Sequence, residues 1–255
     1  MVRGLYTSAT GMITQMRRMD VVTNNLANVN TTGHKRDFVV LRSFSEELTH
    51  RINDDSDWAR SRPIGPYPLG LFIDEVHTDH SVGAFQVTGG ALDVALTAQG
   101  FFVINTMDAD GGIVERFTRD GSFTLGPDNV LLTKAGGRVQ GVGGDIVVPN
   151  GEITIDRAGF IRSNGELVDR LRLTNVTDTQ SLRKVGDNLF AATPETVETA
   201  FAGLVEQGYL ERSNVNSVRE MVEMITLHRI YDANQRLISV HNNTLGNAVN
   251  DIARR

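Results

Sequence analysis

The chain has 255 residues, of which 40% are hydrophobic and 22% are charged, and its formal net charge is −6. This composition supports a folded core, and the acidic balance argues against a general nucleic-acid binder, which needs a basic face. Cysteine is absent, which excludes disulfides, thiolate metal sites and cysteine nucleophiles.

The first thirty residues have the period of an amphipathic helix. One row of positions, spaced alternately by four and three residues, runs through Leu5, Ala9, Met12, Met16, Met19, Thr23 and Leu26. This heptad spacing keeps one side of a helix facing a partner helix. The Asn, Thr and Gly residues at 28–33 favour a cap or turn, so the helix is predicted to end there.

Neither a secretion signal nor a membrane span is predicted. Residues 1–8 are too polar for the apolar core of a cleavable signal peptide. No apolar run approaches the roughly 18–20 residues that cross a bilayer. We therefore expect no direct membrane span, and expect export to use a route that cleaves no signal peptide.

Residues 45–81 contain an acidic run at 53–57 followed by Pro63, Pro66 and Pro68, which favours an extended arm or loop over a packed element. The best metal candidate also lies here, in His77 and His80 with their acidic neighbours. Side chains three residues apart point to opposite sides of an extended segment, which argues against a shared metal ion. A metal-dependent hydrolase built on this pair is a remote alternative.

Residues 82–205 are predicted to form strands. Short apolar segments such as Phe101–Ile104 alternate with turn signals such as Asp120-Gly121 and Asn164-Gly165. The glycines at 136–144 resemble a nucleotide-binding loop only superficially, because a strand-like segment and not a helix follows them. No helical period intervenes, so an antiparallel sandwich or distorted barrel is expected.

The last forty residues repeat the helical pattern of the first thirty. Their row of positions comprises Ser217, Met221, Met224, His228, Tyr231, Gln235, Ile238, Asn242, Leu245, Val249 and Ile252. Polar members of such a row cost stability but can fix register and partner choice. The two terminal helices could pair with each other, or could lie separately on one globular core.

The predicted fold class is therefore α+β, with paired N- and C-terminal coiled-coil helices and a β-rich middle domain. The expected domains are a discontinuous helical domain at 1–44 and 206–255, an arm at 45–81 and a β-rich outer domain at 82–205. The sequence has no Gly-x-Ser-x-Gly elbow, phosphate loop or His-Glu-x-x-His motif. We expect no enzymatic activity and no cofactor.

Three separated motifs resemble one protein family, the bacterial flagellar rod and hook proteins. The first comprises Asn24, Asn25, Leu26, Ala27, Asn28, Thr31, Gly33 and Lys35, and the last comprises Ser213, Asn214, Val215, Arg229 and Asn234. Between them, the segments 92–96, 100–103 and 117–123 also match. Two positions depart from the family pattern, since His34 replaces an aromatic residue and His228 stands where glutamine is common.

The resemblance implies a structural subunit of the flagellar basal-body rod. In this family the termini pair into an inner helical domain, and copies stack into a hollow axial tube that transmits torque from motor to hook and lets exported subunits pass. The implied partners are further copies, adjacent rod and hook proteins and the flagellar type III export apparatus, at a periplasmic location in the basal body. Gln207-Gly208-Tyr209 and the length favour the distal rod. The alternatives are a proximal rod subunit and a non-polymerising accessory or cap protein.

The rows on the two terminal helices are expected to pack against each other, both within one copy and between adjacent copies. A contact repeated by rotation plus translation does not close, and so builds a helical filament. The expected interface residues are Leu5, Met12, Met16, Met19 and Leu26 with Met221, Met224, His228, Tyr231, Ile238 and Leu245.

Overall fold

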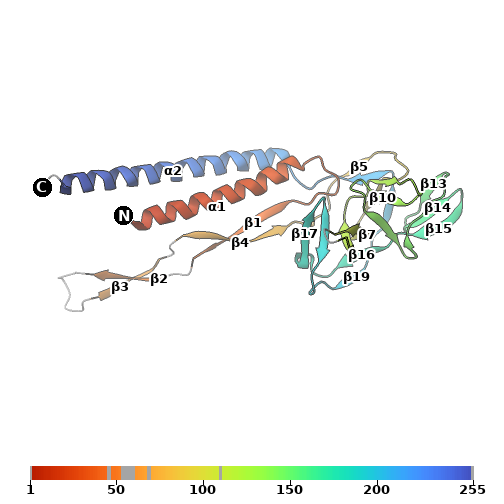
Figure 1. The fold of residues 1–255 in the computed structure, drawn as a ribbon, viewed down its shortest axis with the longest axis horizontal. Coiled ribbons are helices and arrows are strands. Elements are labelled where there is room, and N and C mark those ends of the chain that lie inside the picture. The colour runs from red at the N-terminus through yellow and green to blue at the C-terminus, as the bar shows by residue number, and fades with distance from the viewer. Residues whose placement is uncertain (1, 45–46, 53–60, 68–69, 109–110, 254–255) are drawn as a thin grey trace. The chain divides into compact units, whose positions relative to one another are not determined.

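The computed structural model describes residues 2–44, 47–52, 61–67, 70–108 and 111–253. It is α+β, with a helix at each end of the chain and strands between them (Figure 1). Two compact units are present. The helical unit comprises Met1–Leu26, Asp37–His77 and Ser217–Arg255, and the β-rich unit comprises Ala27–Arg36 and Thr78–Asn216. The division into a helical domain, an arm and an outer domain that the sequence predicts stays a prediction.

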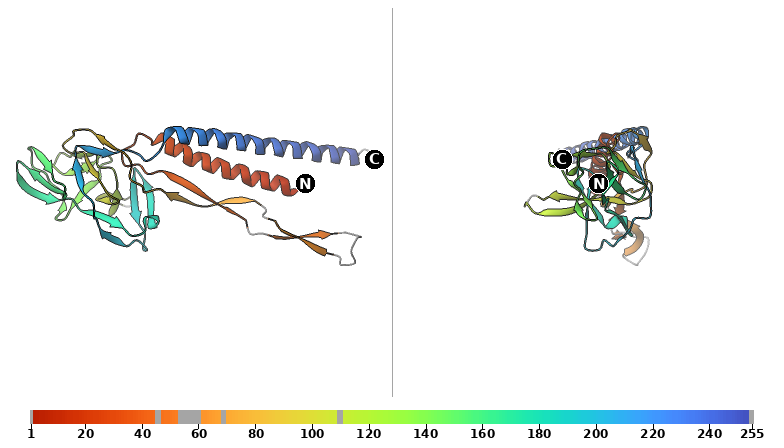
Figure 2. Two further views of the ribbon diagram at one scale, coloured as in Figure 1. Left: turned by 180° about the vertical axis from the view of Figure 1, so that it is seen from behind. Right: turned by 90° about the vertical axis from the view of Figure 1, so that its right-hand side faces the viewer.

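The helical unit contains two paired helices, α1 (Val2–Ala27) and α2 (Ser217–Ala253). Their contacts recur every seven residues along α1 and are, in order, Gly4 with His241, Gly11 with Asn234, Arg18 with Glu223 and Asn25 with Glu220. The partner's number falls as the number on α1 rises, so the helices are antiparallel. In Figures 1 and 2, α1 lies between α2 and a ribbon of strands.

Glycine on α1 lets α2 approach closely. A Cβ atom added to Gly4 would lie 2.8 Å from Nε2 of His241, and one added to Gly11 would lie 3.2 Å from Nδ2 of Asn234. Ser8, one helical turn from each glycine, is buried as well. The first half of the side of α1 that meets α2 therefore contains small residues, which a search for apolar residues does not detect.

Two antiparallel ribbons complete the helical unit. β1 (Asp37–Ser43) lies beside β4 (Leu71–Thr78), and β2 (Glu47–Ile52) pairs with β3 (Ser61–Tyr67). The hydroxyl of Thr14 on α1 donates a hydrogen bond to the carbonyl of Leu71 at 3.3 Å. The segment expected to be an extended arm or loop thus contains regular paired strands. Its acidic run at 53–57 and Pro68 lie outside the described residues.

The β-rich unit is organised around a ten-stranded antiparallel sheet with the main order β17-β18-β8-β7-β11-β10-β9. Its strands are β7 (Phe101–Met107), β8 (Ile113–Thr118), β9 (Phe123–Leu125), β10 (Leu131–Thr133), β11 (Arg138–Gly141), β12 (Gly144–Asp145), β16 (Leu173–Val176), β17 (Leu182–Gly186), β18 (Leu189–Ala192) and β19 (Glu198–Ala200). The glycines at 136–144 lie in or next to the turns of the β10–β11 and β11–β12 hairpins.

Smaller sheets flank this one. They comprise β13 (Ile153–Ile155), β14 (Phe160–Ser163) and β15 (Glu166–Arg170), then β6 (Val94–Leu96) with β20 (Val205–Gln207), and β5 (Phe85–Val87) with β21 (Tyr209–Glu211). A short 3₁₀ helix covers Thr179–Ser181.

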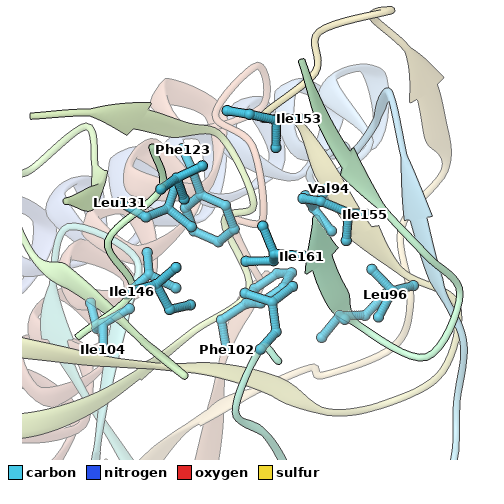
Figure 3. Close-up of a cluster of buried hydrophobic side chains, with 14 residues drawn as sticks. Val94, Leu96, Phe102, Ile104, Phe123, Leu131, Ile146, Ile153, Ile155 and Ile161 are labelled. Carbon is cyan, nitrogen blue, oxygen red and sulfur yellow. The ribbon is translucent and has the colours of Figure 1, made fainter. Parts of the chain in front are cut away.

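Strand β7 is apolar on both faces. Phe102 and Ile104 belong to the larger core of the unit, part of which Figure 3 shows, whereas Phe101 and Val103 belong to a second cluster. Successive side chains of a strand point to opposite faces, so alternate residues of β7 enter the two clusters. Full burial of each such side chain contributes about 1.5–3 kcal/mol.

No helix among the described residues is both long and apolar enough to cross a membrane.

Candidate assembly interface

Asn25 of the N-terminal motif is a fully buried connector in the helical unit. Its Nδ2 donates to the carbonyl of Asp37 at 2.7 Å, and its Oδ1 accepts from the N–H of Asp37 at 2.9 Å. Nδ2 also lies 3.3 Å from Oε2 of Glu220, a buried carboxylate in the first turn of α2. One amide therefore joins both helices to the first strand.

Replacing Asn25 with alanine is expected to destabilise the helical unit by about 2 kcal/mol, because the backbone N–H and C=O of Asp37 and the buried Glu220 carboxylate each lose the hydrogen bond to Asn25. Urea unfolding followed by far-UV circular dichroism measures this loss. Thr23→Ala is the matched control on an exposed position of the same helix, with an expected change below about 0.5 kcal/mol. Equal losses in the two variants would contradict this role for Asn25.

The loop after α1 is held by hydrogen bonds within the β-rich unit. The N–H and Oγ1 of Thr31 each donate to Asn28, both at 3.1 Å. Gly33 has a φ of +67°, and its N–H donates to the carbonyl of Glu211 at 2.9 Å. A Cβ at Gly33 would lie 2.5 Å from the backbone nitrogen of Asp120, so only glycine fits here without displacing the neighbouring backbone.

His34, the first departure from the family pattern, is buried and makes a polar contact through its ring. Its Nδ1 is 3.1 Å from Oδ1 of Asn188, whose Nδ2 donates to the carbonyl of Thr32 at 3.0 Å. Asn188 lies in the β17–β18 turn with a positive φ of 57°, a conformation that Asn tolerates better than most residues. The imidazole thus combines the burial of an aromatic ring with a hydrogen bond to this turn.

Lys35, Glu211 and Arg119 form a buried charge cluster, with all three side chains at most 2% exposed. Nζ of Lys35 lies 2.6 Å from Oε1 of Glu211, and Nε of Arg119 lies 2.5 Å from Oε2. The N–H of Gly83 donates to Oε1 at 2.7 Å. Arg119 also donates to the carbonyls of Gly100 and Leu96, at 2.6 and 2.9 Å. Burial lowers the pKa of Lys35 from its ordinary 10.5, while the charge of Glu211 acts in the opposite direction.

The C-terminal motif contributes a second backbone connector. Oδ1 of Asn214 accepts from the N–H of Arg36 at 2.8 Å, and Nδ2 donates to the carbonyl of Asp79 at 2.8 Å. Val215 is buried, and its N–H donates to Oγ of Ser213 at 3.3 Å. These contacts explain why Asn, Ser and a small apolar residue occur together here.

The other motif residues differ in exposure. Asn24, Ala27 and Arg229 are exposed, whereas Leu26 and Asn234 are half-buried. Asn234 lies against Gly11, as described above. The motif thus includes residues that contact other parts of the chain, such as Asn25 and Asn214, and residues that are exposed, such as Arg229.

The expected interface residues divide into two sets. Half-buried members are Leu5, Met12, Met19, Leu26, Met224, Tyr231, Ile238 and Leu245, and exposed members are Met16, Met221 and His228. The contacts between α1 and α2 that are described above come from a neighbouring row, which includes Glu220, Asn234 and His241. His228 instead lies 3.3 Å from Asp232 on its own helix. Contacts between copies stay a prediction.

An exposed apolar face lies on the first third of α2. Val218, Met221, Val222 and Ile225 are between 50% and 69% exposed. Their spacing of three and four residues places them on one face, and that face is opposite the row that contains Glu220 and Asn234. Helix α1 likewise exposes Tyr6, Ile13 and Met16, at 48% to 58%. Of these exposed apolar residues, the rows of positions predicted from the sequence include only Met221 and Met16.

The two histidines considered for a metal have aromatic neighbours. His77 stacks on Phe38 with ring centroids 5.7 Å apart and contacts Glu75. His80 packs against Phe101 and Phe190, at 5.6 and 5.1 Å. In the described part of the chain, no three His, Asp or Glu residues are placed to hold a metal ion.

Three family models match separate parts of the chain. They are described as flagella basal body rod protein (residues 5–35), flagellar hook protein FlgE/F/G D1 domain (95–163) and flagellar basal body rod FlgEFG protein C-terminal (206–251).

Curated relatives match along most of their length. The flagellar basal-body rod protein FlgF of Caulobacter vibrioides is 32% identical over 238 residues, which cover 91% of each chain. FlgG of Agrobacterium fabrum is 33% identical over 261 residues, covering 93% of this chain and 95% of the relative. The hook-basal body complex protein FlhO of Bacillus subtilis is 28% identical and covers both chains completely. With the motif residues placed as described, the chain belongs to the flagellar basal-body rod protein family.

Proposed function

We propose that this structural rod protein, which is not an enzyme, assembles with copies of itself into a hollow axial tube. The tube would transmit torque from the motor to the hook and let exported subunits pass. The observation that supports assembly best is the exposed face formed by Val218, Met221, Val222 and Ile225 on a helix already paired on its other side. Burial of each side chain by a neighbouring copy stabilises the contact by up to about 1.5–3 kcal/mol.

The helix pair is further proposed to be a two-stranded antiparallel coiled coil. The seven-residue recurrence of the contacts at Gly4, Gly11, Arg18 and Asn25 supports this arrangement, because heptad spacing keeps one seam facing the partner. A sandwich or distorted barrel is proposed for the β-rich unit, supported by the burial of both faces of β7. A coiled coil and a sandwich or barrel would each form a rigid part of the subunit.

The proposed position is the distal rod, supported by length and by Gln207-Gly208-Tyr209. Relatives named FlgF and FlgG are about equally similar, at 32% and 33% identity. The proximal rod is therefore the alternative. Tagged subunits in isolated basal bodies test the choice, and label confined to the membrane-proximal rod would refute the distal position.

The proposed partners are adjacent rod and hook proteins together with the flagellar type III export apparatus. The proposed location is the periplasmic part of the basal body, reached without cleavage of a signal peptide.

Assembly is tested by adding charge to the exposed face of α2. The double variant Val222→Asp/Ile225→Asp is expected to abolish tubes in negative-stain electron microscopy of the concentrated full-length chain, because two carboxylates would be buried at each contact. Asn242→Asp/Asn243→Asp adds the same charge at exposed positions of the same helix and is expected to assemble like the unmodified chain.

Circular dichroism checks that both double variants keep their helices. Tubes from the Val222/Ile225 variant would refute this interface. Monomers from the unmodified chain would favour the alternative of a non-polymerising accessory or cap protein.

A further inference from the structure

A pocket in the β-rich unit is lined by arginines together with apolar residues. Its volume is about 470 Å³, and it is lined by twelve residues that include Arg157, Arg170 and Arg172. Phe201, Leu204 and Val142 are among the apolar lining residues, and no acidic residue lines it in the described part of the chain. This concentration of positive charge contrasts with the chain's net charge of −6.

Two of the three guanidinium groups are held by contacts with other elements. That of Arg170 lies over the ring of Phe160 in β14 at 5.1 Å, and its Nε donates to the carbonyl of Ala158 at 3.0 Å. Arg172 makes a bidentate pair with Glu115 of β8, at 2.7 and 3.1 Å. These contacts restrain the guanidinium groups of Arg170 and Arg172 on different parts of the β-rich unit.

Much of the hydrogen-bonding capacity of these arginines is unused. A guanidinium has several N–H donors in a planar fork that matches a carboxylate. Arg170 uses only Nε in the contact above, and Arg157 lies 3.4 Å from Glu206 with 74% of its side chain exposed. Donors therefore remain for an incoming anion at both residues.

We propose that this pocket binds an acidic segment of a partner polypeptide. Guanidinium groups carried by separate segments can each pair with a different carboxylate of an extended chain. Leu204 and Val142, which are exposed and also line the pocket, match an apolar side chain of the same segment. The site lies in the β-rich unit and requires neither the helix contacts nor the tube proposed above.

The test uses the full chain and a capped peptide of alternating glutamate and leucine, titrated by isothermal calorimetry. The unmodified chain is expected to bind it saturably, and Arg157→Gln/Arg170→Gln is expected to weaken binding at least tenfold, because charge-assisted hydrogen bonds are lost. Arg162→Gln/Arg183→Gln removes the same net charge at exposed positions that do not line the pocket, and should change the affinity less than about twofold.

Two further probes separate the alternatives. A glutamine–leucine peptide that binds as tightly as the acidic one would overturn the charge-based proposal. Inorganic phosphate that displaces the acidic peptide at equal concentration would identify a simple anion site and would overturn the polypeptide assignment. The absence of saturable binding to the unmodified chain would refute the proposal outright.

Discussion

Glu211→Gln is expected to lower the free energy of unfolding of the β-rich unit by about 3–5 kcal/mol, the cost typical of breaking a buried ion pair by removing one partner. The substitution preserves shape but removes the charge that compensates Lys35 and Arg119. Both cations lie within 2.6 Å of the Glu211 carboxylate and are almost completely buried. Hydrogen exchange of the β7 amides, followed by mass spectrometry, measures this free energy for the unit itself.

Glu115→Gln is the matched control in the same unit. Glu115 makes a bidentate pair with Arg172, but both side chains are more than a third exposed. An exposed pair of this kind contributes about 0–1 kcal/mol, so the control should lose little stability. Equal losses of unfolding free energy in the two variants would show that removing a charge from the buried cluster costs no more than removing one from an exposed ion pair.

The loss in the free energy of unfolding caused by Glu211→Gln should become smaller as the pH rises. Burial already lowers the pKa of Lys35, and removing Glu211 removes the main influence that raises it. An unfolded lysine keeps a pKa near 10.5, so between the lowered folded value and 10.5 the unfolded state binds more protons and stability increases with pH. Arg119 also loses its buried partner in Glu211→Gln, so part of the loss of stability persists.

The helical and strand segments could be recognised from the local sequence pattern. Contacts between residues that are far apart in the sequence could not. Helical period reaches only three or four residues along the chain, whereas Lys35 and Glu211 are 176 residues apart. Arg119 and Glu211 are 92 residues apart. The charges of this cluster resemble ordinary strand-end charges until the fold brings them together.

The row of residues between the helices was hard to predict for a different reason. The alternating spacing of four and three residues places Met221 and the polar His228 in the expected contact row, and both are exposed. The contacts made by Gly4 and Gly11 depend on small size, and those of Asn234 and His241 on filling the space that glycine leaves. A pattern of apolar residues does not register either property, although the seven-residue spacing itself was present.

Gly33→Ala is expected to destabilise the β-rich unit by about 3 kcal/mol, from two separate costs. The left-handed conformation at φ +67° costs a residue with a Cβ about 1–2 kcal/mol. The new Cβ would also lie 2.5 Å from the nitrogen of Asp120 and 2.6 Å from the carbonyl carbon of Arg119, and displacing packed atoms adds about 1–3 kcal/mol. Urea unfolding and β7 hydrogen exchange measure the sum.

Gly89→Ala separates these two costs, because Gly89 has nearly the same φ of +70° but no atom within 4 Å of an added Cβ. Its loss should be about 1 kcal/mol, after part of the strain is offset by the lower entropy of the unfolded chain. Gly33→Ala should also loosen the buried charge cluster, since its Cβ would push on the backbone of Arg119, whose side chain binds Glu211. Equal losses at the two glycines would mean that conformation alone requires Gly33, and faster exchange near Glu211 only in Gly33→Ala would show that the loop and the cluster depend on each other.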